Sequence, residues 1–149
     1  MPKTYLDSIP YGQTISHDEI MENLAFLDDW EERYRFIIDL GKQLPEMPAQ
    51  YRSETSKVVG CQSQVWILSQ TATKQCRYGL DSDALIVRGL ICIVLSALNF
   101  KSAQDVVDFD MEDYFSKLDL SSHLSMQRGN GLRAMVSRVK MAAAQAIQT

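Results

Sequence analysis

The chain has 149 residues, of which 46% are hydrophobic and 23% charged, and its formal net charge is −4. This length and composition fit one globular domain with its own core and exclude a disordered or fibrous protein. The basic residues are scattered, which is unlike the charge pattern of a nucleic-acid-binding protein, so no nucleic acid is expected as a partner. The longest apolar block, residues 84–100, is too short to span a bilayer and indicates a buried helix without membrane association.

The first residues predict an arm rather than a helix or strand. Residues 1–15 carry Pro2, Pro10 and Gly12 and show no apolar periodicity. We therefore expect a loosely attached N-terminal arm on a single domain that spans residues 1–149. An apolar segment typical of a secretory signal is absent from this arm, so no export signal is expected.

Two helices are predicted next, each with its own start signal. Ser16 and Glu19 match a capping box, in which each side chain bonds to the other residue's backbone amide. Asp29 repeats the start signal before a second apolar stripe, which Gly41 and then Pro45 end. We expect a short antiparallel helix pair.

The middle of the chain predicts a small sheet and then a core helix. Residues 57–59, 64–69 and 75–80 are short β-favouring segments, and the last two predict a hairpin. Asp81 or Ser82 is expected to cap the helix that follows, which is apolar nearly all round, as a central core helix is.

The C-terminal part is expected to be helical. Ser102 and Asp110 each precede a short helical segment, and residues 126–147 form a long helix with apolar residues along one side. The predicted fold class is α+β, with a small antiparallel sheet of about three strands packed against N-terminal and C-terminal helices.

Cys61 is the residue whose setting most suggests chemistry. It follows Gly60, precedes the polar residues 62–64, and stands at the entry to a predicted strand, whereas Cys92 lies inside an apolar run. A thiol reacts as the thiolate, and with a reference pKa of about 8.5 it needs a nearby cation or amide dipoles at neutral pH. Cys61 is therefore either a presented, reactive thiol or a small residue fitted into a turn, and the spacing leaves both interpretations open.

The remaining cysteines and the histidines suggest no metal site. Cys61, Cys76 and Cys92 lie far apart without a C-x-x-C pair, so the ligand spacing of structural zinc is missing and no metal is expected. Three thiols in a chain without an export signal favour the reducing cytoplasm. His17 or His123 would have to come close to Cys61 to act as its general base.

Two arginines depart from the local rules of helix sequences. Arg128 lies beside Gly129 and Gly131 in the first turn of the last helix, where the helix dipole disfavours a cation and each glycine costs about 1 kcal/mol relative to alanine. It is either a solvated arginine in a flexible loop or an arginine on a bendable segment that faces an anionic sulfur.

Arg88 is a charge inside the apolar helix and needs a partner. Asp83 is too close to Arg88 in the sequence to be its ideal partner, so we expect a carboxylate from elsewhere in the chain or from another protein.

The motifs taken together resemble one family. Residues 60–66 (GCQSQVW) resemble the active-cysteine motif of the SufE/CsdE sulfur acceptors, which collect persulfide sulfur from a cysteine desulfurase for iron–sulfur cluster assembly. Residues 30–45 and 79–90 are similar to the family's N-terminal helix and sheet-to-helix junction. Arg128, with the glycine and leucine that follow, matches its late arginine motif. The similarity covers about residues 16–147.

The resemblance implies a function for each of these motifs. Cys61 would carry the persulfide and Arg128 would stabilise its thiolate or persulfide. The chain would stimulate a SufS- or CsdA-like cysteine desulfurase and pass the sulfur to a downstream scaffold, as a sulfur-transfer partner without a cofactor of its own rather than as an enzyme. The expected partner contacts are Gly60, Gln62, Ser63, Gln64, Asp81, Asp83 and Arg88.

Other interpretations of the thiol stand beside this one. A stand-alone thiol enzyme, such as a peroxide reductase or a hydrolase, would need a base or a resolving partner near Cys61. A plain interaction domain would have an inert Cys61. A carrier that must protect a persulfide has reason to hold its resting thiol in an apolar pocket, and we expect that pocket to be lined by Val58, Val59, Val65 and Trp66.

Overall fold

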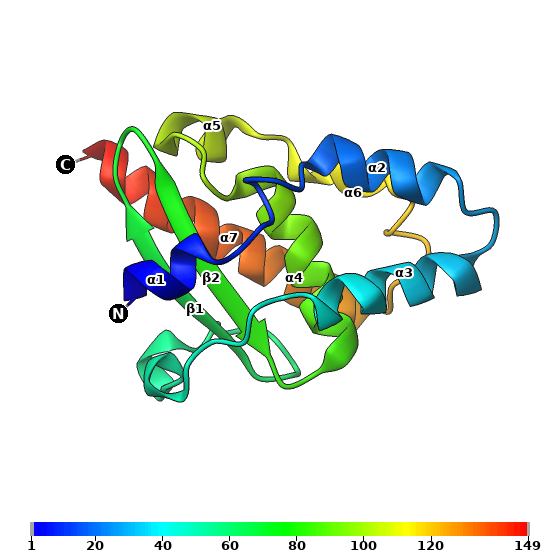
Figure 1. Cartoon of the computed structure of the whole chain (residues 1–149), viewed down its shortest axis with the longest axis horizontal. Helices are drawn as coiled ribbons and strands as arrows, with labels where there is room; N and C mark the ends of the chain where they lie inside the picture. Colours follow the sequence, from blue (N-terminus) through cyan, green and yellow to red (C-terminus); the bar gives the residue numbers. More distant parts are fainter. Residues whose placement is uncertain (1, 149) are drawn as a thin grey trace.

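The computed structural model describes residues 2–148 and has an α+β fold built around one apolar helix (Figure 1). The elements in chain order are α1 (Pro2–Asp7), α2 (His17–Ala25), α3 (Trp30–Lys42), the 3-10 turns η1 (Ala49–Tyr51) and η2 (Glu54–Ser56), β1 (Val65–Thr71), β2 (Cys76–Ser82), α4 (Leu85–Leu98), α5 (Ala103–Asp108), α6 (Met111–Lys117) and α7 (Met126–Gln148). The α+β class expected from the sequence is confirmed.

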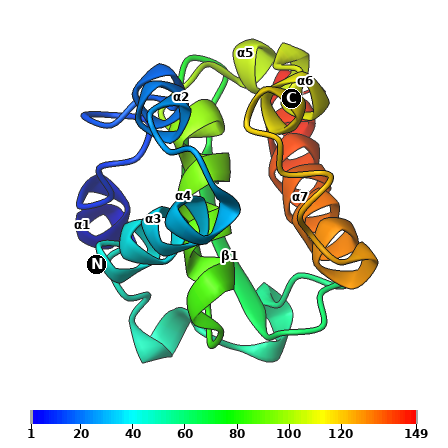
Figure 2. The same cartoon turned by 90° about the vertical axis from the view of Figure 1, so that its right-hand side faces the viewer.

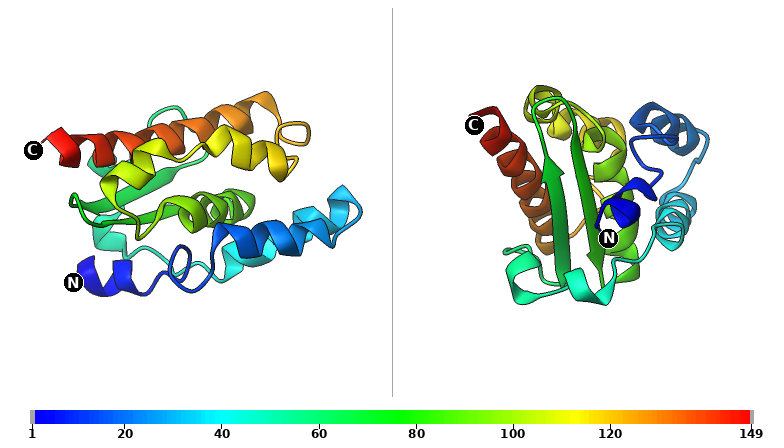
Figure 3. Two further views of the ribbon diagram at one scale, coloured as in Figure 1. Left: turned by 90° about the horizontal axis from the view of Figure 1, so that it is seen from above. Right: turned by 60° about the vertical axis from the view of Figure 1, so that its left-hand side comes forward.

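The central helix α4 is buried along almost its whole length, as its uniformly apolar sequence predicts. Figure 2 shows it between the group α1–α3 on one side and the group α5–α7 on the other. Strand β2 packs on α4 and α1, and β1 packs on α7. Seen from above, these elements form three layers, with the hairpin and α4 in the middle one (Figure 3). Within residues 2–148, no helix combines the length and apolar character needed to cross a membrane.

The sheet has two antiparallel strands, one fewer than expected. Its register runs from Val65 opposite Ser82 to Thr71 opposite Cys76, which confirms the predicted hairpin. Residues 57–59 add only one isolated bridge to β1. These residues lie between η2, which ends at Ser56, and the bend at Gly60, whose φ is 99°, so the segment is too short for a third strand.

The N-terminal segment is part of the core, which corrects the expectation that residues 1–15 form a loosely attached arm. Leu6, Ile9 and Tyr11 are fully buried, and α1 packs against β2. The Tyr11 hydroxyl donates a hydrogen bond of 2.9 Å to the carbonyl of Leu40 at the end of α3. These apolar side chains have no regular spacing in the sequence, so periodicity gave no sign that they would be buried.

Most helix starts follow the predicted caps. Ser16 accepts a hydrogen bond from the third residue of α2, and Asp29 does the same for α3. Ser102 and Asp110 cap α5 and α6 in the same way. Four of the orphan amides at helix starts are thereby satisfied by the residues that the sequence indicated.

Helix α4 begins differently from the prediction. The N-cap position is Ala84, and no side chain caps the helix there. Ser82 accepts only the Ala84 amide, at 3.2 Å. Asp81, expected as a cap, points instead into the core, where it forms a salt bridge with Arg88. Asp81 is 1% exposed, so the carboxylate that Arg88 requires comes from the end of the preceding strand.

The Asp81–Arg88 pair connects three parts of the fold. The Arg88 guanidinium also donates to the carbonyls of Gly41 and Leu44, at the end of α3 and just beyond it. Asp81 also accepts the backbone amide of Met47 at 2.9 Å. A buried ion pair offsets its desolvation only when such additional hydrogen bonds are present. The pair therefore holds the end of α3, the end of β2 and the first turn of α4 together.

Removing one member of this pair is expected to destabilise the fold strongly. Arg88→Met leaves Asp81 as a buried, uncompensated charge, which costs about 3–5 kcal/mol in comparable cases. Arg35→Met is the matched control, because Arg35 pairs with Glu31 on the surface, where such pairs contribute less than about 1 kcal/mol. Urea unfolding of both variants tests the difference. Equal losses of unfolding free energy would contradict the role given to Asp81.

Candidate functional site

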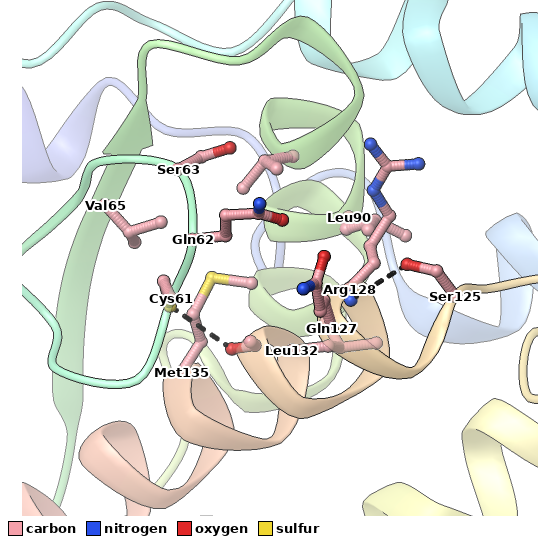
Figure 4. A pocket seen from close by; sticks show the side chains of 12 residues that line it. Cys61, Gln62, Ser63, Val65, Leu90, Ser125, Gln127, Arg128, Leu132 and Met135 are labelled. Carbon is pink, nitrogen blue, oxygen red and sulfur yellow. Dashed lines mark hydrogen bonds between the residues drawn. The ribbon is translucent and has the colours of Figure 1, made fainter.

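Cys61 lies on a short loop, residues 59–64, whose two ends are fastened (Figure 4). At its base the Val58 amide donates to the Val65 carbonyl at 2.8 Å. At its far end the Gln64 amide donates to the Asp83 carboxylate at 3.2 Å, and the Asp83 amide returns a bond to the Gln64 carbonyl. The positive φ of Gly60 supplies the bend between these anchors. The sequence around Cys61 therefore forms a closed loop that presents one thiol.

The thiol of Cys61 is directed at the first turns of α7. Its Sγ donates a hydrogen bond to the Gly131 carbonyl, with 3.4 Å between the two atoms. The side chain is half-buried, and burial raises the pKa of the Cys61 thiol above its ordinary value. A carbonyl oxygen can accept a bond from the thiol but not from the thiolate. The resting state is therefore a protonated, weakly reactive sulfur.

A cavity of about 60 Å³ adjoins this sulfur. It is lined by the loop and β1 (Cys61, Gln62, Ser63, Val65), by α4 (Val87, Leu90) and by the start of α7 with the residue before it (Ser125, Gln127, Arg128, Gly131, Leu132, Met135). One water needs roughly 10–15 Å³ of such space, so the cavity can accept a few additional heavy atoms beside the sulfur. Its walls are mainly apolar on α4 and α7, and its polar groups lie on the loop and at the start of α7.

The expected apolar lining is only partly correct. Val65 lines the cavity, whereas Val59 is 88% exposed on the loop and Val58 is buried outside the cavity. Trp66 points to the other face of the hairpin, where Arg52 lies 5.6 Å from its ring. Strand neighbours alternate between faces, so these side chains cannot all face one pocket. Sequence reasoning does not place α4 and α7 in the cavity wall, although the apolar stripe of α7 is recognisable.

Arg128 lies at the rim of this cavity but does not contact the sulfur. Its backbone amide donates to the Ser125 hydroxyl at 3.1 Å, which fastens the first turn of α7. Its side chain is exposed, and Figure 4 shows the guanidinium directed away from Cys61. Among residues 2–148 it has no acidic partner within salt-bridge distance. Burial raises the pKa of the Cys61 thiol, and in the resting arrangement the Arg128 guanidinium, which points away, does not offset this effect.

The other predicted site residues have different positions. Gln62 and Ser63 line the cavity, and Gln64 and Asp83 anchor the loop. Asp81 and Arg88 form the internal pair described above. Their charges are satisfied within the fold, and contact of these two residues with a partner stays a prediction.

The two histidines lie away from the thiol. His17 packs edge-on against Phe109 and Tyr114, and His123 stacks on Trp30 with 4.2 Å between ring centroids. Neither lines the cavity beside the sulfur, so neither forms a Cys–His dyad with Cys61. In the part of the chain that the structure describes, no group of three or more potential metal ligands gathers.

Two apolar side chains missed by the sequence analysis are exposed close to the site. Met126, at the start of α7 between two cavity-lining residues, is 83% exposed, and Leu85, at the start of α4, is 46% exposed. Together with Val59 on the loop, they flank residues that line the cavity or anchor the loop.

Comparison with known proteins identifies the family of the chain. The family model described as "SufE: Fe-S metabolism associated domain" matches residues 18–143. An uncharacterized SufE-like protein of Rhizobium meliloti is 48% identical over 130 residues, covering 84% of this chain and 92% of the relative. Another from Rhizobium etli is 44% identical over 139 residues, covering 89% of this chain and 94% of the relative.

A solved structure shares the fold at much lower sequence identity. The solution structure of a hypothetical protein from Thermus thermophilus superposes with a TM-score of 0.72 at 17% identity, covering 89% of this chain and 96% of that one. This likeness concerns the fold alone. The family match spans most of the chain, including the Cys61 loop and the start of α7, and each of the two relatives covers more than four fifths of the chain. The chain belongs to the SufE family, whose domain is associated with iron–sulfur metabolism.

Proposed function

We propose that this protein accepts persulfide sulfur from a cysteine desulfurase onto Cys61, stimulates that desulfurase, and passes the sulfur on for iron–sulfur cluster assembly. The observation that supports this most directly is a half-buried thiol on a fastened loop, beside a cavity with room for additional atoms. Cys76 and Cys92 are both buried, and each donates to a backbone carbonyl. Cys61 is thus the thiol with access to a donor.

The transfer step needs only a thiolate and a persulfide. The Cys61 thiolate attacks the outer sulfur of the donor persulfide, and a new S–S bond forms between Cys61 Sγ and that sulfur. The donor's own S–S bond breaks, and its electron pair stays on the donor cysteine, which leaves as a thiolate. The proton lost from Cys61 is available to that leaving sulfur. Delivery to a scaffold cysteine repeats the same exchange, so no external oxidant or reductant is consumed.

The resting geometry has to change before this step. Cys61 is protonated and bonded to the Gly131 carbonyl, so a docked partner must move the loop and favour the thiolate. The exposed side chains of Val59, Leu85 and Met126 provide apolar surface for such a partner. Arg128 would then turn toward the sulfur as its cation. The donor would be a SufS-like or CsdA-like desulfurase, and a reducing cytoplasm suits the three unpaired thiols.

A stand-alone thiol enzyme is less well supported. A peroxide reductase uses a thiolate with a lowered pKa, whereas burial raises the pKa of Cys61. A cysteine hydrolase needs a base within hydrogen-bond distance, and the sulfur bonds instead to a backbone carbonyl. Turnover of peroxide or ester by the isolated protein would favour this alternative.

Sulfur loading is expected at Cys61 and at neither of the other cysteines. After incubation with a cysteine desulfurase and cysteine, peptide mass spectrometry of the wild type should find one added sulfur on Cys61. Cys61→Ser should take up no sulfur and should not stimulate the desulfurase, with circular dichroism as the control for folding. Label on Cys76 or Cys92 would contradict the assignment. Full stimulation by Cys61→Ser would instead indicate an interaction domain with an inert thiol.

Alkylation of Cys61 in the free protein is expected to be slow at neutral pH. A raised pKa lowers the thiolate fraction, and each unit by which the pKa rises reduces the alkylation rate about tenfold. The rate should increase with pH and reach half its maximum at a higher pH than for a cysteine-containing peptide. Adding a catalytically inactive desulfurase should accelerate the reaction, with Cys61→Ser as the blank. Rapid alkylation that the partner does not change would exclude a protected resting thiol.

Arg128→Ala is expected to slow sulfur transfer roughly tenfold while binding to the desulfurase changes much less. The reason is that a cation near the sulfur favours the thiolate, whereas docking relies on the apolar surface. Arg133→Ala is the matched control, because Arg133 lies on the same helix but pairs with Glu112. Arg128→Lys should restore part of the rate. Equal effects of Arg128→Ala and Arg133→Ala on single-turnover transfer would contradict a specific role for Arg128.

A further inference from the structure

Two glycines lie in the first turns of α7, where each costs about 1 kcal/mol relative to alanine. Gly129 has open space beside it, because an added Cβ would meet only the Arg133 side chain, at 3.7 Å. Gly131 is buried and faces the loop, and an added Cβ would lie 3.7 Å from both the Cα and the Sγ of Cys61. Neither residue has the positive φ that would require glycine. The presence of Gly131 therefore needs another explanation.

The resting fold does not exclude alanine at position 131. A separation of 3.7 Å between the added Cβ and the Cys61 sulfur is ordinary van der Waals contact. The substitution would also raise the helix propensity of α7. What it would remove is empty space, because the new methyl group would stand beside the sulfur at the wall of the 60 Å³ cavity.

A persulfide needs space of this kind. Its outer sulfur lies about 2.05 Å from Sγ, well inside the contact distance that separates non-bonded atoms. The outer sulfur must therefore enter the cavity or point into solvent. The apolar side chains of Val87, Leu90, Leu132 and Met135 line the cavity side. A methyl group at position 131 would narrow the cavity where it meets the sulfur.

We propose that Gly131 is a positioning residue for the persulfide. By lacking a side chain, it leaves the space on α7 that the outer sulfur of persulfidated Cys61 occupies between loading and delivery. The same residue accepts the Cys61 thiol through its carbonyl before loading, so it contacts the sulfur at both stages. This inference rests on the proposed function, because it concerns how the loaded protein protects its sulfur.

The test compares Gly131→Ala with Gly129→Ala, two identical substitutions in neighbouring turns of one helix. Each purified protein is loaded with inorganic polysulfide, whose terminal sulfur the Cys61 thiolate takes while the shortened polysulfide leaves. After the polysulfide has been removed, iodoacetamide alkylates the outer sulfur, and mass spectrometry measures the rate of this alkylation. We expect trapping to be roughly tenfold faster in Gly131→Ala than in the wild type. Gly129→Ala should keep the wild-type rate.

Two further measurements separate protection from a general effect on folding. Thermal unfolding should show both alanine variants at least as stable as the wild type, because both remove a helical glycine. Alkylation of the unloaded thiol should differ little between them, because the added methyl group can be accommodated at rest. If the role of Gly131 were merely structural, Gly131→Ala would change thermal stability or alkylation of the unloaded thiol. It would then not change the trapping of the persulfide alone.

Several outcomes would overturn the inference. One is an unchanged trapping rate in Gly131→Ala. Another is a wild-type persulfide that reacts as fast as glutathione persulfide, a comparison that needs no variant. Because loading by polysulfide uses no desulfurase, it tests the inference separately from the relay. A wild-type protein that accepts polysulfide sulfur but takes none from a desulfurase would count against the proposed function and would leave the role of Gly131 standing.

Discussion

The buried salt bridge between Asp81 and Arg88 is the interaction on which the arrangement of the site depends. It connects the strand that ends the hairpin to the helix that follows, and it reaches the end of α3 through two carbonyls. Val87 and Leu90 lie on either side of Arg88 in the sequence and line the thiol cavity. The ion pair that fixes the first turn of α4 therefore also fixes one wall of the site.

Features with local sequence signals could be predicted from the chain alone. Ser16 and Asp29 cap helices because the residues involved are three positions apart, and the hairpin follows from short β-favouring segments. Cys61 was recognisable because a cysteine after a glycine, among polar residues, is unusual. Arg128 is recognisable for a similar reason, since its charge conflicts with the dipole of its own helix. Both residues line the same cavity.

Features decided by long-range packing could not be predicted. Asp81 has the local chemistry of a helix cap, but the partly buried guanidinium of Arg88 binds its carboxylate more strongly than exposed backbone amides would. The apolar residues of the N-terminal segment have no period, so only the folded chain shows that Tyr11 reaches Leu40. The opposite wall of the thiol cavity comes from α7, far along the chain, and no spacing rule relates it to the loop.

The hydrogen bond from the Cys61 thiol to the Gly131 carbonyl has a consequence for chemical selectivity. Hydrogen peroxide and low-molecular-weight disulfides react with thiolates, and the first oxidation product of a thiolate is a sulfenic acid. A thiol that keeps its proton and donates it in a hydrogen bond to a backbone oxygen reacts poorly with all of these reagents. In the proposed relay, Cys61 would then distinguish its sulfur donor from small reagents by which of them can reach and ionise the thiol, rather than by binding affinity. Small molecules would react slowly with the few free molecules whose thiol is ionised, whereas a macromolecule that reshapes the loop would meet a much larger fraction of thiolate.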